Sequence, residues 1–388
     1  MLEKLRIENY KSIDKLELDL GRVNVFIGEN GSGKSNILEA IALGAAAVSS
    51  KLDNEFLATR GIRVTEPQLM RSAFDKDNLD GEIKLDFYGK NDAKLECLLA
   101  NRNQPYSKWF DRITTTDFLE EGKTSFKIPI KDLPSLRGIS NPEKLTIEEI
   151  EEIRTSTYEA RRQTTNEINL AEFLIYSPHN PALRTFEKEG QIQPLGINGE
   201  GLFKLLKVLN LEAEGNKIKR LKEKLELINW FEDLEIPSNL YASEQSLKIT
   251  DMYLESGLFF DQKSVNEGFL FLLFYFSLFI SDDTPKFFAI DNIDASLNPK
   301  LCSRLIEELV NLAIESDRQV IFTTHNPGIL DGLDVGDDDQ RLFAIYRNKL
   351  GHTKARRIFK PEPLPGQKLI RLSEAFLRGY IGGLPKNF

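Results

Sequence analysis

A glycine-rich segment near the N-terminus constrains the fold more than any other feature of this sequence. The segment reads Gly28-Glu29-Asn30-Gly31-Ser32-Gly33-Lys34-Ser35. It matches the pattern of a phosphate-binding P-loop. The run 23–27 before it is β-branched and mostly apolar, as in a central strand, and apolar residues at helical spacing follow it. Because a P-loop needs a strand before it and a helix after it, the pattern predicts an α/β fold rather than a chance glycine-rich turn.

The residues of this loop predict ATP and Mg²⁺ as cofactors. Glycines let backbone N–H groups turn inward around the β-phosphate, and the start of the following helix adds partial positive charge. Lys34 would reach the β- and γ-phosphate oxygens, and the Ser35 hydroxyl would ligate Mg²⁺. The predicted nucleotide-binding residues of this segment are Asn30, Gly31, Ser32, Gly33, Lys34, Ser35 and Asn36.

A carboxylate on the magnesium side of the site is predicted at Asp291. The segment Phe287–Asp291 consists of four apolar residues and then an acid, which is typical of a buried strand that ends at a site. Asp291 is expected to hold Mg²⁺ largely through water, together with Ser35. The alternative interpretation is a surface aspartate at a strand end.

Composition excludes several classes of protein. The chain of 388 residues has a net charge of −9 and a pI near 5.2, which argue against bulk attraction to nucleic acid but leave a local basic strip open. Cys97 and Cys302 are too far apart for a metal motif and are expected to be reduced, buried thiols. The N-terminus shows no apolar signal segment, and the apolar run 269–280 is shorter than the roughly 20 residues of a membrane span. We therefore expect a cytoplasmic protein with no membrane partner.

The order of predicted elements indicates one ATPase core interrupted by a helical lobe. Strands are predicted near 5–7, 16–20, 83–87, 174–176, 287–291 and 320–324, and helices near 37–45, 146–169, 201–233 and 301–312. The basic run 217–222 would be a solvated helix face or, less often, a DNA-contacting strip. The predicted division is 1–100 for the N-terminal part of the core with the P-loop, 101–235 for the insertion lobe, and 236–388 for the C-terminal part of the core.

Four segments carry a family resemblance: an opening strand at 7–13, the P-loop and its helix at 32–41, a D-loop at 294–299 and a switch-histidine loop at 323–327. Together they resemble the ABC-type ATPases of the RecF/SMC group, and more closely the stand-alone branch related to the overcoming-lysogenisation-defect (OLD) ATPases. The resemblance implies a P-loop NTPase of this type, with an N-terminal mixed sheet, a parallel P-loop sheet flanked by helices, and a helical insertion lobe in place of a long coiled coil.

The resemblance also implies a nucleotide site shared between two protomers, and hence a homodimer or higher homo-oligomer. Each ATP would lie between one P-loop and the partner's signature loop, which in this sequence is Val265-Asn266-Glu267-Gly268. The family usually has serine at the position of Asn266, whose amide can also donate to a phosphate oxygen. Ser264 could take that place through a bulge. Asp294 of the D-loop would join the same site.

Catalytic roles are assigned by the same resemblance to Lys34, His325 and Asn292. The residue after the strand-end aspartate is normally a glutamate that polarises the attacking water, whereas Asn292 can orient water but cannot take its proton. A general base is typically worth about 10² to 10⁴-fold, so we expect slow hydrolysis and a long-lived ATP-bound dimer. His325 is expected close to the γ-phosphate. An alternative is that His325 or Glu267 activates the water.

Three functions follow as hypotheses. The first is an ATPase sensor or scaffold in prokaryotic anti-phage defence, acting with a separately encoded effector such as a nuclease or toxin, since the sequence shows no Toprim nuclease region. The second is a RecF-like DNA-repair ATPase that acts on duplex DNA, a reading that the acidic balance weakens. The third is a nucleotide-binding scaffold without turnover.

Overall fold

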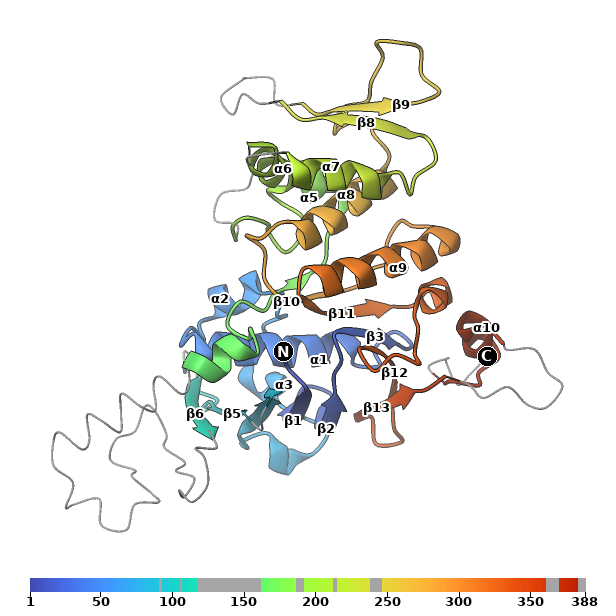
Figure 1. Ribbon diagram of the computed structural model, residues 1–388. Helices are drawn as coiled ribbons and strands as arrows, with labels where there is room; N and C mark the ends of the chain where they lie inside the picture. The colour runs from blue at the N-terminus through green and yellow to red at the C-terminus, as the bar shows by residue number, and fades with distance from the viewer. Residues whose placement is uncertain are drawn as a thin grey trace.

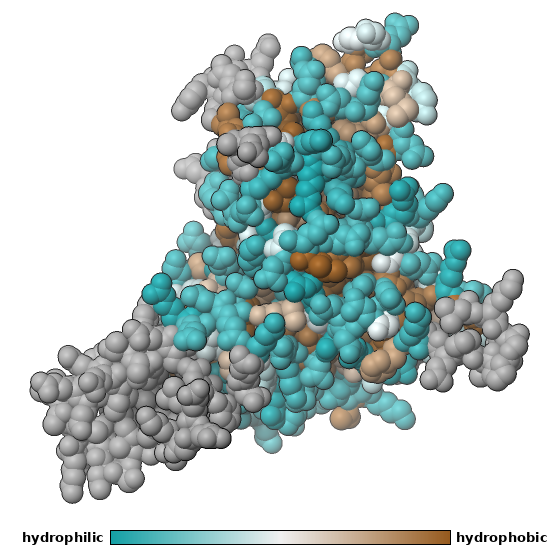
Figure 2. Space-filling view, in the orientation of Figure 1, coloured by the Kyte–Doolittle hydropathy of each residue, from teal (hydrophilic) through white to brown (hydrophobic). Residues whose placement is uncertain are grey.

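Two large β-sheets, with a helix between them, form the body of the protein (Figure 1). The computed structural model describes residues 1–90, 93–104, 107–116, 162–185, 192–211, 215–237, 246–360 and 370–382. Hydrophilic residues cover most of the face shown in Figure 2, and smaller apolar areas lie between them.

The first sheet is antiparallel throughout, with the strand order β2-β1-β4-β5-β6. Its strands are β1 (Lys4–Tyr10), β2 (Ile13–Asp19), β4 (Ile83–Tyr88), β5 (Lys94–Ala100) and β6 (Phe110–Thr116). The sequence predicted a mixed sheet here. Short connections such as the one between β4 and β5 require antiparallel neighbours, because a parallel pair needs a long crossover.

The second sheet carries the P-loop and has the order β13-β12-β3-β11-β10-β7. Its strands are β3 (Val23–Ile27), β7 (Ile175–Tyr176), β10 (Phe287–Ile290), β11 (Gln319–Thr324), β12 (Gln340–Arg347) and β13 (Thr353–Ile358). All neighbours are parallel except the edge pair β12–β13, so this sheet is mixed rather than purely parallel. The strands predicted at 23–27, 174–176, 287–291 and 320–324 are confirmed.

The second sheet separates two hydrophobic cores. Side chains alternate between the faces of a strand, so Val25 and Ile27 enter one core while Phe26 enters the other. Helix α1 (Lys34–Val48) packs in the core shared with the first sheet, together with residues of α2 (Asn54–Thr59) and α3 (Pro67–Met70). The short helix η1 (Lys76–Asn78) follows them in the chain.

Helices α8 (Glu267–Ile280) and α9 (Pro299–Glu315) belong to the other core. Every residue from 269 to 280 is buried, which confirms the prediction of a buried helix. Among the described residues, no helix has the length and apolarity needed to span a membrane. The 3₁₀ helix η4 (Pro327–Gly332) packs on α9, and the C-terminal α10 (Leu372–Leu377) docks on η4.

A lobe of helices and one hairpin covers α8 (Figure 1). It contains α5 (Asn180–Leu183), α6 (Leu202–Leu211), α7 (Asn216–Leu225), β8 (Phe231–Glu235) and β9 (Lys248–Asp251). The helices predicted within 201–233 are α6 and α7, and the end of that range is the start of strand β8. The range 101–235 also holds β6 and β7, which belong to the two large sheets, so a division at residues 100 and 235 stays a prediction. Of the helix predicted at 146–169, residues before 162 lie outside the described residues, and 162–167 are helical.

The basic run on α7 is held by acidic side chains of the same protein. Lys217 pairs with Asp282, Lys222 with Asp233 and Lys224 with Glu308. Arg220 pairs with Glu315 near the end of α9. These pairs fasten α7 to its neighbours and reduce the charge that this face could offer to DNA.

Candidate active site

Three neighbouring parallel strands bring the predicted site residues to one edge of the second sheet. Strand β11 lies between β3 and β10, with Thr324 opposite Ile27 and Phe322 opposite Ile290. The carboxyl ends of parallel strands meet at the same edge, so the P-loop after β3, His325 after β11 and Asp291 after β10 lie together. Residues that are far apart in the sequence thus form one site.

Lys34 is buried in this site without a carboxylate partner among the described residues. Its ammonium group donates to the carbonyl oxygens of Gly28 and Glu29 at 2.9 and 3.1 Å. Its third contact is Nε2 of His325 at 3.1 Å. Burial lowers the pKa of Lys34 to about 8, and burial followed by the charge of Lys34 lowers the pKa of His325. His325 is therefore neutral at pH 7, and its Nε2 accepts the hydrogen bond.

Ser35 and Asp291 lie in direct contact on the other side of the P-loop. The Ser35 hydroxyl donates to Oδ2 of Asp291 at 3.0 Å, and the hydroxyl of Thr323 donates to the other carboxylate oxygen. Thr323 was not predicted, and it orients the carboxylate because it also accepts a hydrogen bond from the backbone N–H of Asn292 at 2.9 Å. The next residue, Thr324, donates to Oδ1 of Asp294 at 2.6 Å and so fixes the D-loop.

The P-loop is packed so closely that two of its glycines cannot carry a side chain. A Cβ on Gly28 would lie 2.1 Å from the carbonyl oxygen of Ile345, and one on Gly33 would lie 2.0 Å from Oγ1 of Thr353. Gly33 also has φ of +104°, which disfavours other residues. Arg347 fixes the loop from outside, because its Nε donates to the carbonyl oxygen of Gly31 at 2.7 Å. Arg347 and Thr353 come from the β12–β13 hairpin, and no local sequence signal points to them.

A pocket of about 400 Å³ opens beside the first turn of α1. Its wall includes Lys11, Ser12, Asn36, Arg63, Phe74 and Arg347. The amide of Asn36 donates to Oγ of Ser12 at 2.6 Å, and Arg63 donates to Oδ1 of Asn36 at 3.1 Å. This pocket lies next to the P-loop and combines cations with the half-exposed ring of Phe74.

Glu39 on α1 holds the cations of that pocket and was not predicted as a site residue. Its carboxylate is buried, accepts from Nε of Arg63 at 2.5 Å and forms an ion pair with Lys11. The Lys11 ammonium group also donates to the carbonyl oxygen of Arg63 at 2.8 Å. Burial lowers the pKa of Lys11. The sequence signal for this contact is Glu39 itself, a charged residue among the apolar residues of the helix after the P-loop.

Asn292 has a backbone conformation that few residue types adopt readily. Its φ is +57°, in the left-handed region that asparagine tolerates better than most residues. Its side chain is exposed, and among the described residues no hydrogen bond of that side chain is formed. The amide is thus free to meet a water or a phosphate oxygen beside Asp291.

The predicted signature residues lie at the N-terminus of α8 and not on the P-loop of the same chain. Asn266 caps this helix: its Oδ1 accepts from the backbone N–H of Phe269 at 2.9 Å, which leaves the amide NH₂ as a donor. Glu267 and Gly268 form the first turn, and Gly268 lies beside the D-loop. Within the described ranges, no hydrogen bond or ion pair joins residues 266–268 to the P-loop.

Arg184 holds the loop before the signature residues. Its guanidinium donates to the carbonyl oxygens of Gln262, Lys263 and Val265 at 2.7, 2.8 and 3.0 Å. Arg184 directly follows α5, whose N-terminus is capped by the side chain of His179. No local pattern predicts this contact, because residues 78 to 81 positions apart in the chain form it.

The residues present fit a nucleoside triphosphate with a divalent cation. The buried Lys34 ammonium lacks an anionic partner, and the buried Oγ of Ser32 has no hydrogen-bond partner among the described residues. A serine hydroxyl beside a carboxylate is an oxygen donor set that suits Mg²⁺. In the described part of the chain no group of three His, Cys, Asp or Glu side chains could hold a metal, so Mg²⁺ would depend on Ser35, Asp291, phosphate oxygens and water.

Solved structures share this fold. The SMC head bound to the C-terminal winged-helix domain of ScpA aligns over 92% of this chain and 98% of its own, with a TM-score of 0.57 and 14% identity. The SMC head with an extended coiled coil bound to the C-terminal domain of ScpA, derived from Pyrococcus furiosus, aligns over 92% and 96%, with a TM-score of 0.50 and 14% identity. These likenesses show the ABC-type head fold.

Curated relatives match over shorter regions. The uncharacterized protein MJECL10 of Methanocaldococcus jannaschii is 32% identical over 113 residues, which are 28% of this chain and 50% of that protein. The DNA replication and repair protein RecF of Lysinibacillus sphaericus is 40% identical over 55 residues, 14% of this chain and 15% of RecF. The matches thus span half or less of these relatives.

A family model matches most of this chain. It covers residues 23–331 and is described as "AAA domain, putative AbiEii toxin, Type IV TA system". The matched range runs from β3 to the end of η4 and includes the P-loop, Asp291 and His325. The protein therefore belongs to this AAA-domain family.

Proposed function

We propose that the protein binds ATP·Mg²⁺, dimerises around it, hydrolyses it slowly and serves as a sensor or scaffold for a separate effector. The observation that carries the proposal is the convergence of Lys34, Ser35, Asp291 and His325 at one sheet edge. The description of the family as a putative toxin of a toxin–antitoxin system supports a role with an effector, and prokaryotic anti-phage defence is the setting we propose.

Each side chain has a distinct task in this proposal. Lys34 donates to phosphate oxygens in place of its present backbone partners, and Ser35 and Asp291 hold the cation. A Mg²⁺ held by Ser35 and Asp291 would supply positive charge against the negative charge that develops on the phosphate. Neutral His325 contacts the terminal phosphate or the water beside it. Asn292 orients that water through its amide but cannot accept its proton, so turnover is slow.

The nucleoside would occupy the pocket beside α1. Asn36, which lines this pocket, directly follows the phosphate-binding residues Lys34 and Ser35 in the chain. Phe74 of the pocket wall would stack on the base. Arg63 and Lys11, both held by Glu39, would lie near the ribose and phosphates. Phe74→Ala should weaken ATP binding more than it weakens pyrophosphate binding.

We infer dimerisation because the P-loop and the signature residues 266–268 of one chain form no hydrogen bond or ion pair with each other among the described residues. Asn266 presents a donor at the N-terminus of α8 but does not bond to its own P-loop. A facing protomer would bring that donor, and the helix N-terminus behind it, to the phosphates. Light scattering with and without ATP·Mg²⁺ tests this proposal. A monomer at saturating ATP·Mg²⁺ would exclude composite sites, whereas an ATP-dependent dimer that is lost in Gly268→Asp would support them.

The effector role is tested with the genes that lie beside this one. Co-expression and purification should recover a complex with a nuclease or toxin, and the pair should restrict phage only while Lys34 is intact. A chain that restricts phage equally well with Lys34→Ala, or that needs no neighbour, contradicts the proposal.

A RecF-like role on duplex DNA is the second candidate, favoured by the similarity to RecF. Its test is binding to duplex DNA at several salt concentrations, because phosphate contacts make log K fall steeply with log salt. The α7 cations are paired within the protein, so we expect no salt-dependent binding through that helix. Tight, strongly salt-dependent binding that requires ATP would favour the RecF-like role over the effector role.

A further inference from the structure

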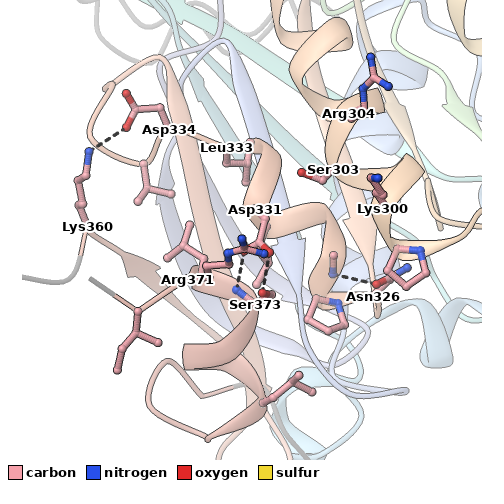
Figure 3. Close-up of a pocket in the computed structure, with 18 residues that line it drawn as sticks. Lys300, Ser303, Arg304, Asn326, Asp331, Leu333, Asp334, Lys360, Arg371 and Ser373 are labelled. Atoms are coloured by element: carbon pink, nitrogen blue, oxygen red, sulfur yellow. Dashed lines mark hydrogen bonds and ion pairs between the residues drawn. The ribbon is translucent and has the colours of Figure 1, made fainter. Parts of the chain in front are cut away.

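A second pocket, of about 1110 Å³, lies beside α9, η4 and α10 and outside the P-loop site (Figure 3). In Figure 3, Lys300, Ser303 and Arg304 of α9 line one side, Asp334 and Lys360 lie on the opposite side, and Arg371 lies between them. Apolar side chains form much of the remaining wall, and they include Leu330, Leu333, Ile370, Leu372 and Leu377. Leu377 is 63% exposed at the rim.

The charges of this pocket are predominantly positive, although the chain as a whole carries −9. Lys300, Arg304 and Arg371 are exposed, and none of their side chains forms a hydrogen bond or ion pair with another described residue. The two carboxylates of the wall are already engaged. Asp331 accepts from the backbone N–H and hydroxyl of Ser373 at 3.0 and 2.7 Å, and Asp334 pairs with Lys360 at 3.5 Å. Within the described residues, three cationic side chains therefore remain for an external anion.

The pocket wall is continuous with two loops of the ATP site. Lys300 is in the first turn of α9, directly after the D-loop, and Asn326 directly follows His325. The helices that follow these loops, α9 and η4, are tightly packed: a Cβ on Gly328 would lie 2.8 Å from the carbonyl oxygen of Pro299, and one on Gly332 would lie 2.2 Å from that of Ser303. An occupant of the pocket would therefore touch helices that directly follow the loops of Asp294 and His325.

We propose that this pocket is a docking site for an acidic segment of a separate protein, with apolar side chains that enter the pocket between Lys300, Arg304 and Arg371. The volume exceeds that of most small-molecule sites, and apolar leucines beneath unpaired cations complement a peptide with both carboxylates and apolar groups. None of the described lining residues is aromatic, which disfavours single-stranded nucleic acid, because its bases stack on aromatic rings. This pocket is the surface that the separate effector would use, an assignment that rests on the proposed function.

The experiment selects ligands without assuming a partner. Random short peptides displayed on phage are selected against the intact protein, with the Arg304→Glu/Arg371→Glu variant as counter-selection. We expect enriched peptides to combine Asp or Glu with Leu, Ile or Phe. The strongest peptide, labelled with fluorescein, should bind the intact protein with a Kd in the micromolar range and bind the double variant at least about tenfold more weakly, since each exposed charge pair contributes up to about 1 kcal/mol.

Two further variants test whether the effect is specific to the pocket. Lys300→Glu is a second, independent change in the pocket, and Lys349→Glu alters the same charge in the exposed turn between β12 and β13. ATP binding should be unchanged in all of these variants, which shows that they fold. The proposal is overturned if the selection enriches no peptide, if enriched peptides are basic or lack apolar residues, if Lys349→Glu weakens binding as much as the pocket variants do, or if duplex DNA binds the pocket cations instead. Loss of ATP binding or of dimerisation alone would affect only the proposed ATPase function.

Discussion

Nε2 of His325 lies 3.1 Å from the ammonium group of Lys34, which joins the switch loop after β11 to the P-loop after β3. Both groups are partly withdrawn from water, and burial lowers the pKa of each. Their contact persists without a phosphate only because His325 is neutral and accepts the hydrogen bond. A phosphate that attracts Lys34 would release His325, so the loop before η4 can respond directly to the nucleotide.

Lys34→Ala should abolish ATP binding and leave the fold intact. The side chain supplies charge to the phosphates, and hydrogen bonds of a charged donor contribute about 1.5–3 kcal/mol. The pKa of Lys34 is lower in the folded chain than its ordinary value, so its buried charge costs stability below about pH 8. Without nucleotide, the melting temperature of the variant at pH 7 should therefore be no lower than that of the wild type. Wild-type ATP affinity in titration calorimetry would refute the assigned role.

ATP binding should weaken as the pH rises through about 8. Lys34 is protonated below its pKa of about 8 and loses its charge above it, whereas bound phosphates favour the protonated form. Binding then takes up a proton, and affinity should fall by up to about tenfold for each pH unit above 8. Titration calorimetry in buffers of different ionisation enthalpy measures this uptake. Lys34→Arg, which stays charged throughout, should show a flat profile, and an equally flat wild-type profile would contradict the prediction.

Arg184→Met should weaken the ATP-dependent dimer without affecting ATP binding to one chain. The substitution removes three hydrogen bonds to the loop before Asn266 and should raise the dimer Kd by about 10- to 100-fold. Arg378→Met is the control, because Arg378 is exposed and interacts with the nearby Glu374 and Tyr380 of the C-terminal segment. Light scattering reports the dimer, and hydrogen exchange of residues 261–266 reports the loop. If hydrogen exchange of residues 261–266 rises while the dimer Kd is unchanged, the order of this loop does not control dimerisation.

The centre of the site could be predicted because short segments of the sequence determine its strands, loop and helix. A strand, a glycine loop and a helix occur consecutively around Lys34, and four apolar residues before Asp291 indicate a buried strand that ends in an acid. Parallel strands align their carboxyl ends, so the P-loop meets Asp291 and His325 once β3, β11 and β10 are neighbours.

The supporting contacts could not be predicted because they join distant segments. Arg347 binds the carbonyl oxygen of Gly31 from 316 positions away, and Thr353 contacts Ser32 from 321 positions away. Strand order and register decide such contacts, and no periodicity in the sequence encodes the placement of β12 beside β3. The antiparallel pairing of β4, β5 and β6 was not predicted for a similar reason. The sequence pattern of residues 91–140 is weak, so neither the strand bounds nor the lengths of the connections between them could be read from it.

Asn292→Glu should raise the rate of ATP hydrolysis by about ten- to a hundredfold, because it adds a carboxylate base where the present amide can only orient water. The backbone at this position complicates the comparison, since φ is +57° and a residue other than asparagine or glycine loses about 1 kcal/mol there. Asn292→Gln is therefore the matched control: it has the length and the strain of the glutamate variant and lacks only the base.

Steady-state phosphate release separates the two accounts of water activation. If the missing base limits turnover, hydrolysis is slow in the wild type and in Asn292→Gln, faster in Asn292→Glu, and the ATP-bound dimer of the glutamate variant dissociates sooner. If His325 or Glu267 activates the water instead, wild-type hydrolysis is fast, is unchanged or reduced in Asn292→Glu, and is lost when His325 or Glu267 is replaced. In the proposed dimer, Glu267 in the first turn of α8 would act from the facing protomer, so its replacement should impair hydrolysis only above the concentration at which the dimer forms.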